Sequence, residues 1–503
     1  MVIQISLDVG CYSISCRNFN GGPDGSCVTL FYSNQMTAST QKDSIFRLFI
    51  KAIKGEEQNF TEGSINRAIF LLAIPMIVEM GMESIFAVVD IFFVSKLNSS
   101  DAVAAVGYTE SVLSILYSLA MGLGMGATAI VARRVGEKDF KGASIAAVQA
   151  IYLALAIAFV ISVIGFFYYK EILALMGASQ AVLNSSSGYA FWMFTGNYTV
   201  TLLFLINAVF RGAGNAAIAM KSLLLANILN MILDPIFIFG WGPIPSMGVE
   251  GAAIATNIGR GVGVLFQLYF LLNGKSIIKL GIDKLAIHGA IILNVVKVSG
   301  GSILQFIIGS ASWIFLMKLM SNFGDNAVAG YTTAIRIFIF TLLPSWGLAN
   351  AGATLVGQNL GAQQPERAET SVWRAAYYNA FFMVLVMILF LTAAPWIIGI
   401  FTQQEEVLAY GVQALRYVSL GYVFYGYGMV VMQALNGAGD TYTPTILNVL
   451  GFWVFQIPFA YFVAIELGWE AKGVFIAIAL AESLMAVAGI IVFRRGKWKG
   501  VKI

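Results

Sequence analysis

The sequence is poor in charge, in cysteine and in histidine. Only 11% of its 503 residues are charged, and it holds three cysteines and one histidine. The cysteines, Cys11, Cys16 and Cys27, have no second pair and no histidines at the spacing of a zinc site. We therefore expect no structural metal centre and no disulfide. Because His288 stands alone in a polar loop, we find no catalytic constellation and expect no enzymatic activity.

Two classes of partner are also disfavoured. The net charge of +4 is too small to indicate nucleic-acid binding. The stretch "NGKS" at Asn273 is similar to the end of a phosphate-binding loop, but Tyr269 stands where that motif needs glycine, and no strand precedes it. We therefore expect neither a bound nucleotide nor any other cofactor.

Apolar residues are abundant instead, at 58% of the chain. A helix needs about 20 apolar residues to cross a bilayer, and twelve such runs are found. This predicts an all-α integral membrane protein with twelve transmembrane helices in contact with the lipid bilayer. The expected spans are residues 65–95, 102–132, 142–168, 187–210, 216–240, 248–273, 289–320, 326–356, 370–392, 407–435, 442–466 and 472–493.

Positive charge collects in alternate connections between these spans. By the positive-inside rule, we expect both termini in the cytoplasm and a multi-pass protein of the cell membrane, plasma or inner. The residues concerned are Arg133, Arg134, Lys138 and Lys141, then Lys275, Lys279 and Lys284, and finally Arg494, Arg495, Lys497 and Lys499.

The two halves of the chain repeat each other. "GATAIVARRVGEKDFKGA" from Gly126 recurs as "GATLVGQNLGAQQPERA" from Gly352, and "AVFRGAGN" recurs as "QALNGAGD". The displacement of roughly 225 residues predicts a duplicated unit of six spans, repeated in parallel. Two such lobes favour a carrier with two packings over a pore. The expected parts are an extension 1–61, lobes 62–273 and 289–493, a cytoplasmic linker 274–288 and a basic tail 494–503.

The amino-terminal extension lacks the features of a signal peptide. We expect it to be cytoplasmic and partly disordered, with residues 1–35 either native or the product of a start upstream of Met36. Residues 43–55 place apolar side chains on one helical face and basic ones mostly on the other. This predicts a helix lying in the membrane interface, or else an ordinary cytoplasmic helix before the first span.

Acidic residues occur within the apolar spans, where each costs about 2.5–3.5 kcal/mol and is functional by default. Glu79, Glu83 and Asp90 in the first span are separated by four and seven residues, so they share one helical face. Pro75 lies four residues before Glu79 and predicts a bend, because proline cannot donate a backbone hydrogen bond.

The fifth span carries Asn230 and Asp234 one turn apart. Together with Asp90 and the hydroxyl of Thr256, they would supply hard oxygen ligands for Na⁺, or a carboxylate pair that holds one proton. Pro235 would bend the helix and release a carbonyl as a further ligand. The alternative is that Asp234 caps a broken helix and Asp90 pairs with a nearby donor.

Other side chains are candidates for lining a substrate cleft. Aromatic rings and methionines on inner faces suit flat cationic molecules, whereas arginines near helix ends commonly extend to the interface. Acids elsewhere either face the bundle interior or stabilise a lobe. The residues in question are Tyr189, Trp192 and Met193, then Arg260, Arg336 and Arg416, and the acids Glu110 and Glu482.

These features resemble the MATE family of multidrug and toxic compound extrusion transporters over residues 62–495. The resemblance is carried by "PMIVEMGMESIFAVVDIFFVSKL", "RGAGN", "NMILDPIFIF" and "GVEGAAIAT" in the first half. In the second half, "VAGYTTAIRI", "VGQNLGA" and "LNGAGDTYTP" are similar to the family's repeat of these elements.

The resemblance implies a two-lobed antiporter that expels cationic or amphipathic drugs against Na⁺ or H⁺. Relatives with a cation site in the first lobe use positions that match Asp90, Asn230, Asp234 and Thr256. It also points to Tyr189 and Asn207 as lining a substrate cavity, and we add Glu83 and Arg260 as further candidates for that cavity. Another branch adds a seventh-span glutamate, where this chain has Gln305, so a carboxylate site in the second lobe is not expected.

One alternative function stays open, a flippase for a lipid-linked oligosaccharide or precursor. Such a protein would line its cleft with several cations to hold pyrophosphate, whereas the buried charge in the first half is mainly acidic. We therefore expect small organic cations and a coupling cation as partners, and a monomer.

Overall fold

The computed structural model describes residues 2–8, 11–17, 45–55, 59–97, 99–274, 276–281 and 284–503. The chain divides into two units, Met1–Ser44 and Ile45–Ile503. In the first unit, β1 (Val2–Asp8) pairs antiparallel with β2 (Cys11–Arg17). The rest of the predicted extension up to residue 44 lies outside the described residues.

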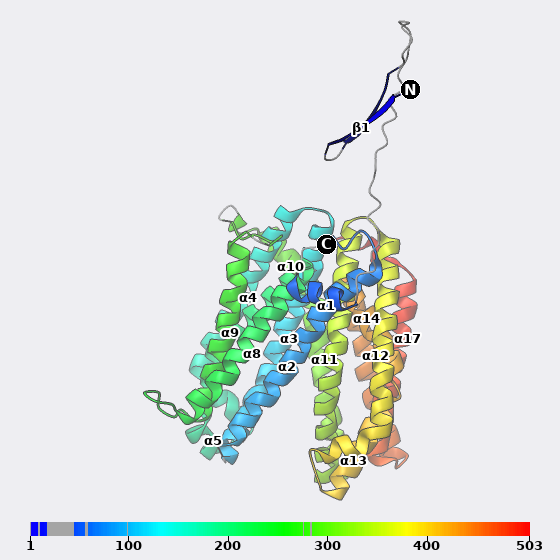
Figure 1. Cartoon of the computed structure of the whole chain (residues 1–503). Helices are drawn as coiled ribbons and strands as arrows, with labels where there is room; N and C mark the ends of the chain where they lie inside the picture. The colour runs from blue at the N-terminus through cyan, green and yellow to red at the C-terminus, as the bar shows by residue number, and fades with distance from the viewer. Residues whose placement is uncertain are drawn as a thin grey trace. The chain divides into compact units, whose positions relative to one another are not determined.

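The second unit is helical (Figure 1). Its first half begins with α1 and continues into the first lobe. The helices are α1 (Ile45–Lys54), α2 (Ile65–Ser95), α3 (Ser100–Gly136), α4 (Phe140–Leu175), α5 (Gln180–Ser185), α6 (Ser187–Thr195), α7 (Asn197–Gly212), α8 (Ala216–Phe239) and α9 (Val249–Leu272).

The second lobe follows the same order. Its elements are α10 (Gly289–Met320), η2 (Ser321–Phe323), α11 (Asp325–Gly361), α12 (Pro365–Gly399), α13 (Glu405–Ser419), α14 (Tyr422–Ala438), α15 (Tyr442–Asn448), η3 (Val449–Gln456), α16 (Ile457–Tyr461), η4 (Phe462–Glu466), α17 (Glu470–Arg494) and η5 (Lys497–Gly500).

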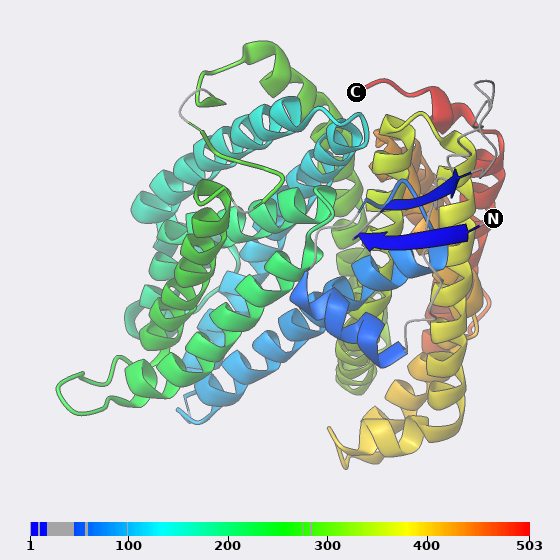
Figure 2. The same ribbon diagram turned by 45° about the horizontal axis from the view of Figure 1, so that its top comes forward.

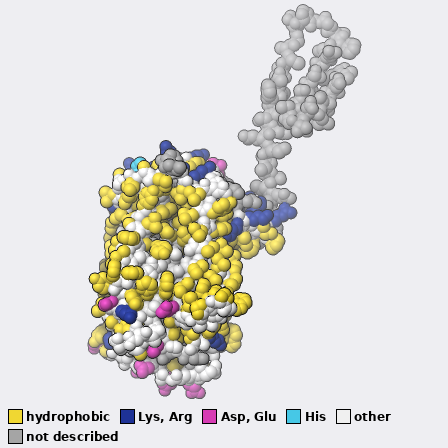
Figure 3. Space-filling view, turned by 90° about the vertical axis from the view of Figure 1, so that its left-hand side faces the viewer, with side chains coloured by type: hydrophobic (Ala, Val, Ile, Leu, Met, Phe, Trp, Pro, Cys, Tyr) yellow, Lys and Arg dark blue, Asp and Glu magenta, His cyan; other side chains and the backbone are white. Residues whose placement is uncertain are grey.

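Within the described residues, nine helices are long and apolar enough to cross a membrane, and two bent pairs raise this to eleven. The 24-residue α9, which packs along α8, gives a twelfth long segment. The all-α fold with two six-span lobes is therefore confirmed for Ile45–Ile503, whereas the strands β1 and β2 of the first unit were not predicted. Figure 3 shows apolar side chains across the middle of one face, with basic side chains gathered at one end.

Two expected straight spans are bent. The fourth span breaks by 45° between α6 and α7, and the tenth by 60° between α13 and α14. Both breaks contain a glycine, Gly196 and Gly421, at equivalent places in the two repeats. A Cβ on Gly196 would lie 2.2 Å from the Asn257 side chain, and one on Gly421 would lie 2.9 Å from the Ala479 carbonyl. Glycine is needed because a neighbouring helix approaches each bend closely.

The prolines leave α2 and α8 unbroken. α2 continues through Pro75 and α8 through Pro235 as single helices, so a bend at either residue stays a prediction. Pro458, the counterpart of Pro235 in the repeat, lies in α16 between two π-helical segments. Since proline cannot donate to the preceding turn, the wider π-helical turns accommodate it.

The helix α1 occupies Ile45–Lys54, within the predicted segment (Figure 2). Ala52 packs into the core beside α2, and the Lys54 carbonyl accepts a hydrogen bond from Lys221 at 2.8 Å. Phe46 and Phe49 are exposed. The position of this helix in a membrane interface stays a prediction.

The lobes meet at the end of the helices that carries Arg133, Arg134 and Lys499, here called the basic end. There, Arg133 of the first lobe donates to the carbonyls of Ala438 and Val501, both at 3.1 Å. Gln358 of the second lobe donates to the Gly212 carbonyl at 3.0 Å. These bonds tie the lobes together at the basic end.

Away from this contact lies a cavity of about 870 Å³, here called the central cavity, whose lining comes almost entirely from the second lobe. It runs between α10 and α11 and is also lined by Ser114 of α3. Lys318 and Ser321, at the end opposite to the basic end, line it together with Trp346. The lobes are thus in contact at the basic end, and the central cavity lies towards the other end.

Candidate functional site

The fifth and sixth spans place three predicted residues together in the first lobe. Because α8 stays helical, Asn230 and Asp234 lie one turn apart, and the Asn230 Nδ2 donates to Asp234 Oδ1 at 2.9 Å. The same nitrogen lies 3.3 Å from the Thr256 hydroxyl on α9. A Cβ on Gly259 would lie 2.7 Å from the Ala226 carbonyl, so glycine lets α9 come this close to α8. All three polar residues are buried.

Asp90 reaches the same region from α2. Its side chain is buried, and the charges of Asp90 and Asp234 lie near enough to act on each other. Tyr189 of α6, also buried, lies beside the Asp90 carboxylate. The structure therefore joins Asn230, Asp234 and Thr256 by hydrogen bonds and places Asp90 and Tyr189 in the same region of the first lobe.

Three buried oxygens of this cluster have no hydrogen-bond partner among the residues that the structure describes. They are Asp90 Oδ1, Asn230 Oδ1 and Asp234 Oδ2. An unsatisfied buried oxygen is unfavourable, and two carboxylates repel each other. A small cation or a proton would offset both costs, and carboxylate and amide oxygens are ligands that hard cations prefer. The donor set therefore fits Na⁺ or H⁺.

The structure excludes one alternative for Asp234. α8 continues from Ala216 to Phe239 without a break, so Asp234 caps no helix end. Its hydrogen-bond donor is the neighbouring amide of Asn230.

The other first-span acids form ion pairs. Glu79 Oε1 lies 2.6 Å from the Arg211 guanidinium of α7, and Glu83 Oε1 lies 3.2 Å from that of Arg260 on α9. Arg260 also stacks over the Phe86 ring, at 4.6 Å from the ring centre. Glu83 and Arg260, which were predicted to line a substrate cavity, are thus paired with each other here.

Asn207 belongs to a separate polar cluster. Its side-chain oxygen accepts hydrogen bonds from Ser222 and from Gln267, and all three residues are buried. Of the other predicted cleft residues, Arg336, Arg416 and Trp192 are exposed. The pairing of Arg211 with Glu79 was not predicted, since the two residues are 132 positions apart.

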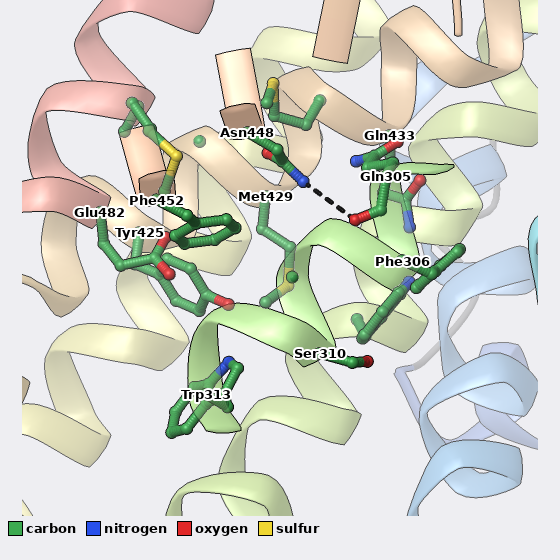
Figure 4. Close-up of a pocket in the computed structure, with 16 residues that line it drawn as sticks. Gln305, Phe306, Ser310, Trp313, Tyr425, Met429, Gln433, Asn448, Phe452 and Glu482 are labelled. Carbon is green, nitrogen blue, oxygen red and sulfur yellow. Dashed lines mark hydrogen bonds between the residues drawn. The ribbon is translucent and has the colours of Figure 1, made fainter. Parts of the chain in front are cut away.

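The second lobe holds a cavity of about 260 Å³, here called the second-lobe cavity (Figure 4). Aromatic and methionine side chains make up half of its lining residues, and Glu482 of α17 contributes a carboxylate. No carboxylate site was expected in this lobe. The signal was present in the sequence, because Glu482 interrupts the apolar run "FIAIALAESLMAVAG" as Asp90 interrupts "FAVVDIFFV".

Known protein families show where this chain belongs. The model of the MatE family matches residues 75–236 and matches again at residues 301–462. This chain belongs to that family. The two matches cover the same part of each lobe, which agrees with the predicted duplication. As a MatE family member, it is a multi-span membrane protein of a transporter family.

Individual proteins similar to this chain carry names that refer to multidrug resistance or export. The chain is 23% identical over 88% of its length to "Probable multidrug resistance protein YpnP" of Bacillus subtilis (strain 168), covering 98% of that protein. It is 24% identical over 86% of its length to "Multidrug export protein MepA" of Staphylococcus aureus (strain MSSA476), covering 94% of it. A solved "multidrug resistance MATE family transporter of the MOP superfamily" in an outward-facing conformation matches this MatE chain with a TM-score of 0.82 at 27% identity. That match covers 89% of this chain and 100% of the other.

Proposed function

We propose that this protein exports small organic cations and amphipathic drugs by antiport with Na⁺ or H⁺, through alternating access. The observation that carries the proposal is the set of three partnerless buried oxygens on Asp90, Asn230 and Asp234. The names of the relatives, which refer to multidrug resistance and export, support the substrate class.

The coupling step would depend on charge in the first lobe. With the site empty of a cation, the carboxylates of Asp90 and Asp234 repel each other across a poorly solvated gap. Binding of Na⁺ or a proton removes that repulsion and favours the packing that holds the cation best. A ligand shifts a conformational equilibrium only by its difference in affinity for the two states. The Asn230 amide keeps Asp234 in position in this scheme through the hydrogen bond at 2.9 Å.

The conformation of the lobes fits one state of the proposed alternating access. If both termini are cytoplasmic, as the positive charge predicts, the basic end faces the cytoplasm and the central cavity faces outwards. The structure would then correspond to an outward-facing state, in which a substrate is released and a coupling cation enters.

A cationic substrate is favoured over the pyrophosphate of a lipid-linked precursor. The arginines nearest the candidate site, Arg211 and Arg260, are already paired with Glu79 and Glu83. Because a glutamate already neutralises each arginine, neither is well suited to bind an anionic substrate.

Efflux of the fluorescent cation ethidium from cells tests this function. We expect Asp90→Asn and Asp234→Asn each to reduce the efflux rate at least tenfold, because each removes a carboxylate from the coupling site. The exposed Glu366→Gln is the control and should leave efflux unchanged. Efflux near the wild-type rate in both aspartate variants, at equal protein in the membrane, would show that coupling lies elsewhere.

A further inference from the structure

We propose that the second-lobe cavity is a binding site for the exported substrate, a flat monovalent organic cation, with Glu482 as its counterion. The inference rests on the proposed function in that it assumes export of cations. It adds where the substrate binds and which group neutralises it.

Glu482 has no cationic partner. Within the part of the chain that the structure describes, no ion pair or hydrogen bond engages its carboxylate. Figure 4 shows the carboxylate beside Tyr425 and Phe452. An ionised carboxylate in such surroundings is unfavourable unless a cation joins it. The carboxylate is therefore neutralised either by a proton or by a cationic ligand, and the adjoining cavity has room for the ligand.

The rest of the lining suits an organic cation. Trp313, Tyr425 and Phe306 offer aromatic faces, and Met429 lies between them in Figure 4. Aromatic faces attract cations, and most strongly in poorly solvated surroundings. Methionine side chains adapt to ligands of different shape. Together these groups would bind planar cationic ring systems that differ in shape.

The lining differs from that of the first-lobe site in a way that disfavours Na⁺. In the first lobe, two carboxylates, an amide and a hydroxyl converge. Here Glu482 is the one carboxylate among the lining residues, and the side-chain oxygens of Gln305 and Gln433 on the other side each accept a hydrogen bond from Asn436 at 3.1 Å. A small hard cation needs several oxygens, whereas an organic cation needs one counterion and apolar contact.

A substrate can reach this cavity from the central cavity. Trp313, Trp346, Tyr425 and Met429 line both the second-lobe cavity and the central cavity. A cation that enters the central cavity would therefore meet the same aromatic residues before it reaches Glu482. This connection also gives room for a ligand that extends beyond 260 Å³.

Ethidium binding to the purified full-length protein tests the inference. Ethidium is permanently charged, and fluorescence polarisation in detergent measures its Kd without any ion gradient. We expect Glu482→Gln to weaken binding at least tenfold and Glu482→Asp, which keeps the charge, to weaken it less than threefold. The exposed Glu466→Gln serves as the matched control and should bind like the wild type.

A second variant keeps the test valid even if Glu482→Gln does not fold. Trp313 is only half-buried, so Trp313→Ala is expected to fold and to weaken ethidium binding several-fold. An unchanged Kd in Glu482→Gln that melts like the wild type would overturn the inference, even if transport were lost, because Glu482 would then serve coupling. If Glu482→Gln does not fold, an unchanged Kd in Trp313→Ala would overturn it.

The proposed function and this inference fail in different ways. Asp234→Asn should keep the wild-type Kd for ethidium while it loses transport, since the two sites lie in different lobes. If Glu482→Gln weakens binding but Asp234→Asn transports normally, the substrate site stands and the coupling site does not. If Asp234→Asn loses transport but Glu482→Gln binds ethidium like the wild type, the coupling site is supported and the substrate site is refuted.

Discussion

The two lobes share one plan and differ in what their interiors hold. Both bend their fourth span at an equivalent glycine, and both keep a proline at the same place in the fifth. The residue before that proline is Asp234 in the first lobe and Ile457 in the second. The first lobe carries convergent oxygens and the second an aromatic cavity with one acid. Duplication preserved the architecture, and the chemistry was divided between the copies.

The largest effect is expected from breaking the buried pair of Glu83 and Arg260. Arg260→Met leaves a carboxylate without its partner in the first lobe, and we expect a loss of about 3–5 kcal/mol in stability. The equivalent change of an exposed arginine in the second lobe, Arg416→Met, should have almost no effect. Thermal unfolding in detergent measures both. The double variant with Glu83→Met should recover most of the loss, and equal loss in single and double variants would contradict the pairing.

The second change places a carboxylate where the second lobe has none. Ile457→Asp copies Asp234 without an Asn230 or Asp90 to meet it, so we expect a loss of about 2.5–3.5 kcal/mol. We would compare the unfolding midpoint of Ile457→Asp with that of Ile457→Asn. The difference separates the effect of the negative charge from the effect of a polar side chain. If Ile457→Asp melts like the wild type, the surroundings of the two prolines are more alike than the structure indicates.

The smallest effect concerns the two bends. Gly421→Ala would push a Cβ against the Ala479 backbone, which cannot yield easily, and we expect a loss of about 1–3 kcal/mol. The new Cβ of Gly196→Ala would meet the Asn257 side chain. Moving that side chain would break the hydrogen bond that it accepts from the Thr199 hydroxyl, so we expect a loss of about 0.5–1.5 kcal/mol in stability. Stability measured on both variants checks this order, and a reversed order would show that the backbone at Gly421 yields.

The sequence predicted the architecture well because membrane spans need only local composition. The first span was predicted at residues 65–95, which are the bounds of α2. The bends in the fourth and tenth spans were missed, because they depend on a neighbouring helix and not on the residues of the break alone. Gly196 and Gly421 are not distinguished in the sequence from the many glycines that cause no bend.

The candidate site was predictable only in part. Asn230 and Asp234 share a face because helical spacing places them there, and Asp90 is conspicuous in its apolar run. The partners of Glu79 and Glu83 depend on tertiary packing, so Arg211 and Arg260 were not assigned to them. Glu482 was visible as an isolated acid, but only the fold shows that it borders a cavity lined by Trp313 and Tyr425.

The central claim is that the first lobe couples a cation to substrate export, and transport in proteoliposomes tests it most directly. Ethidium transport is measured under an imposed Na⁺ gradient alone, an imposed H⁺ gradient alone, and neither. The account predicts that one gradient drives transport in the wild type and that Asp234→Asn abolishes this response. Equal transport with neither gradient, or an undiminished response in Asp234→Asn, would contradict it.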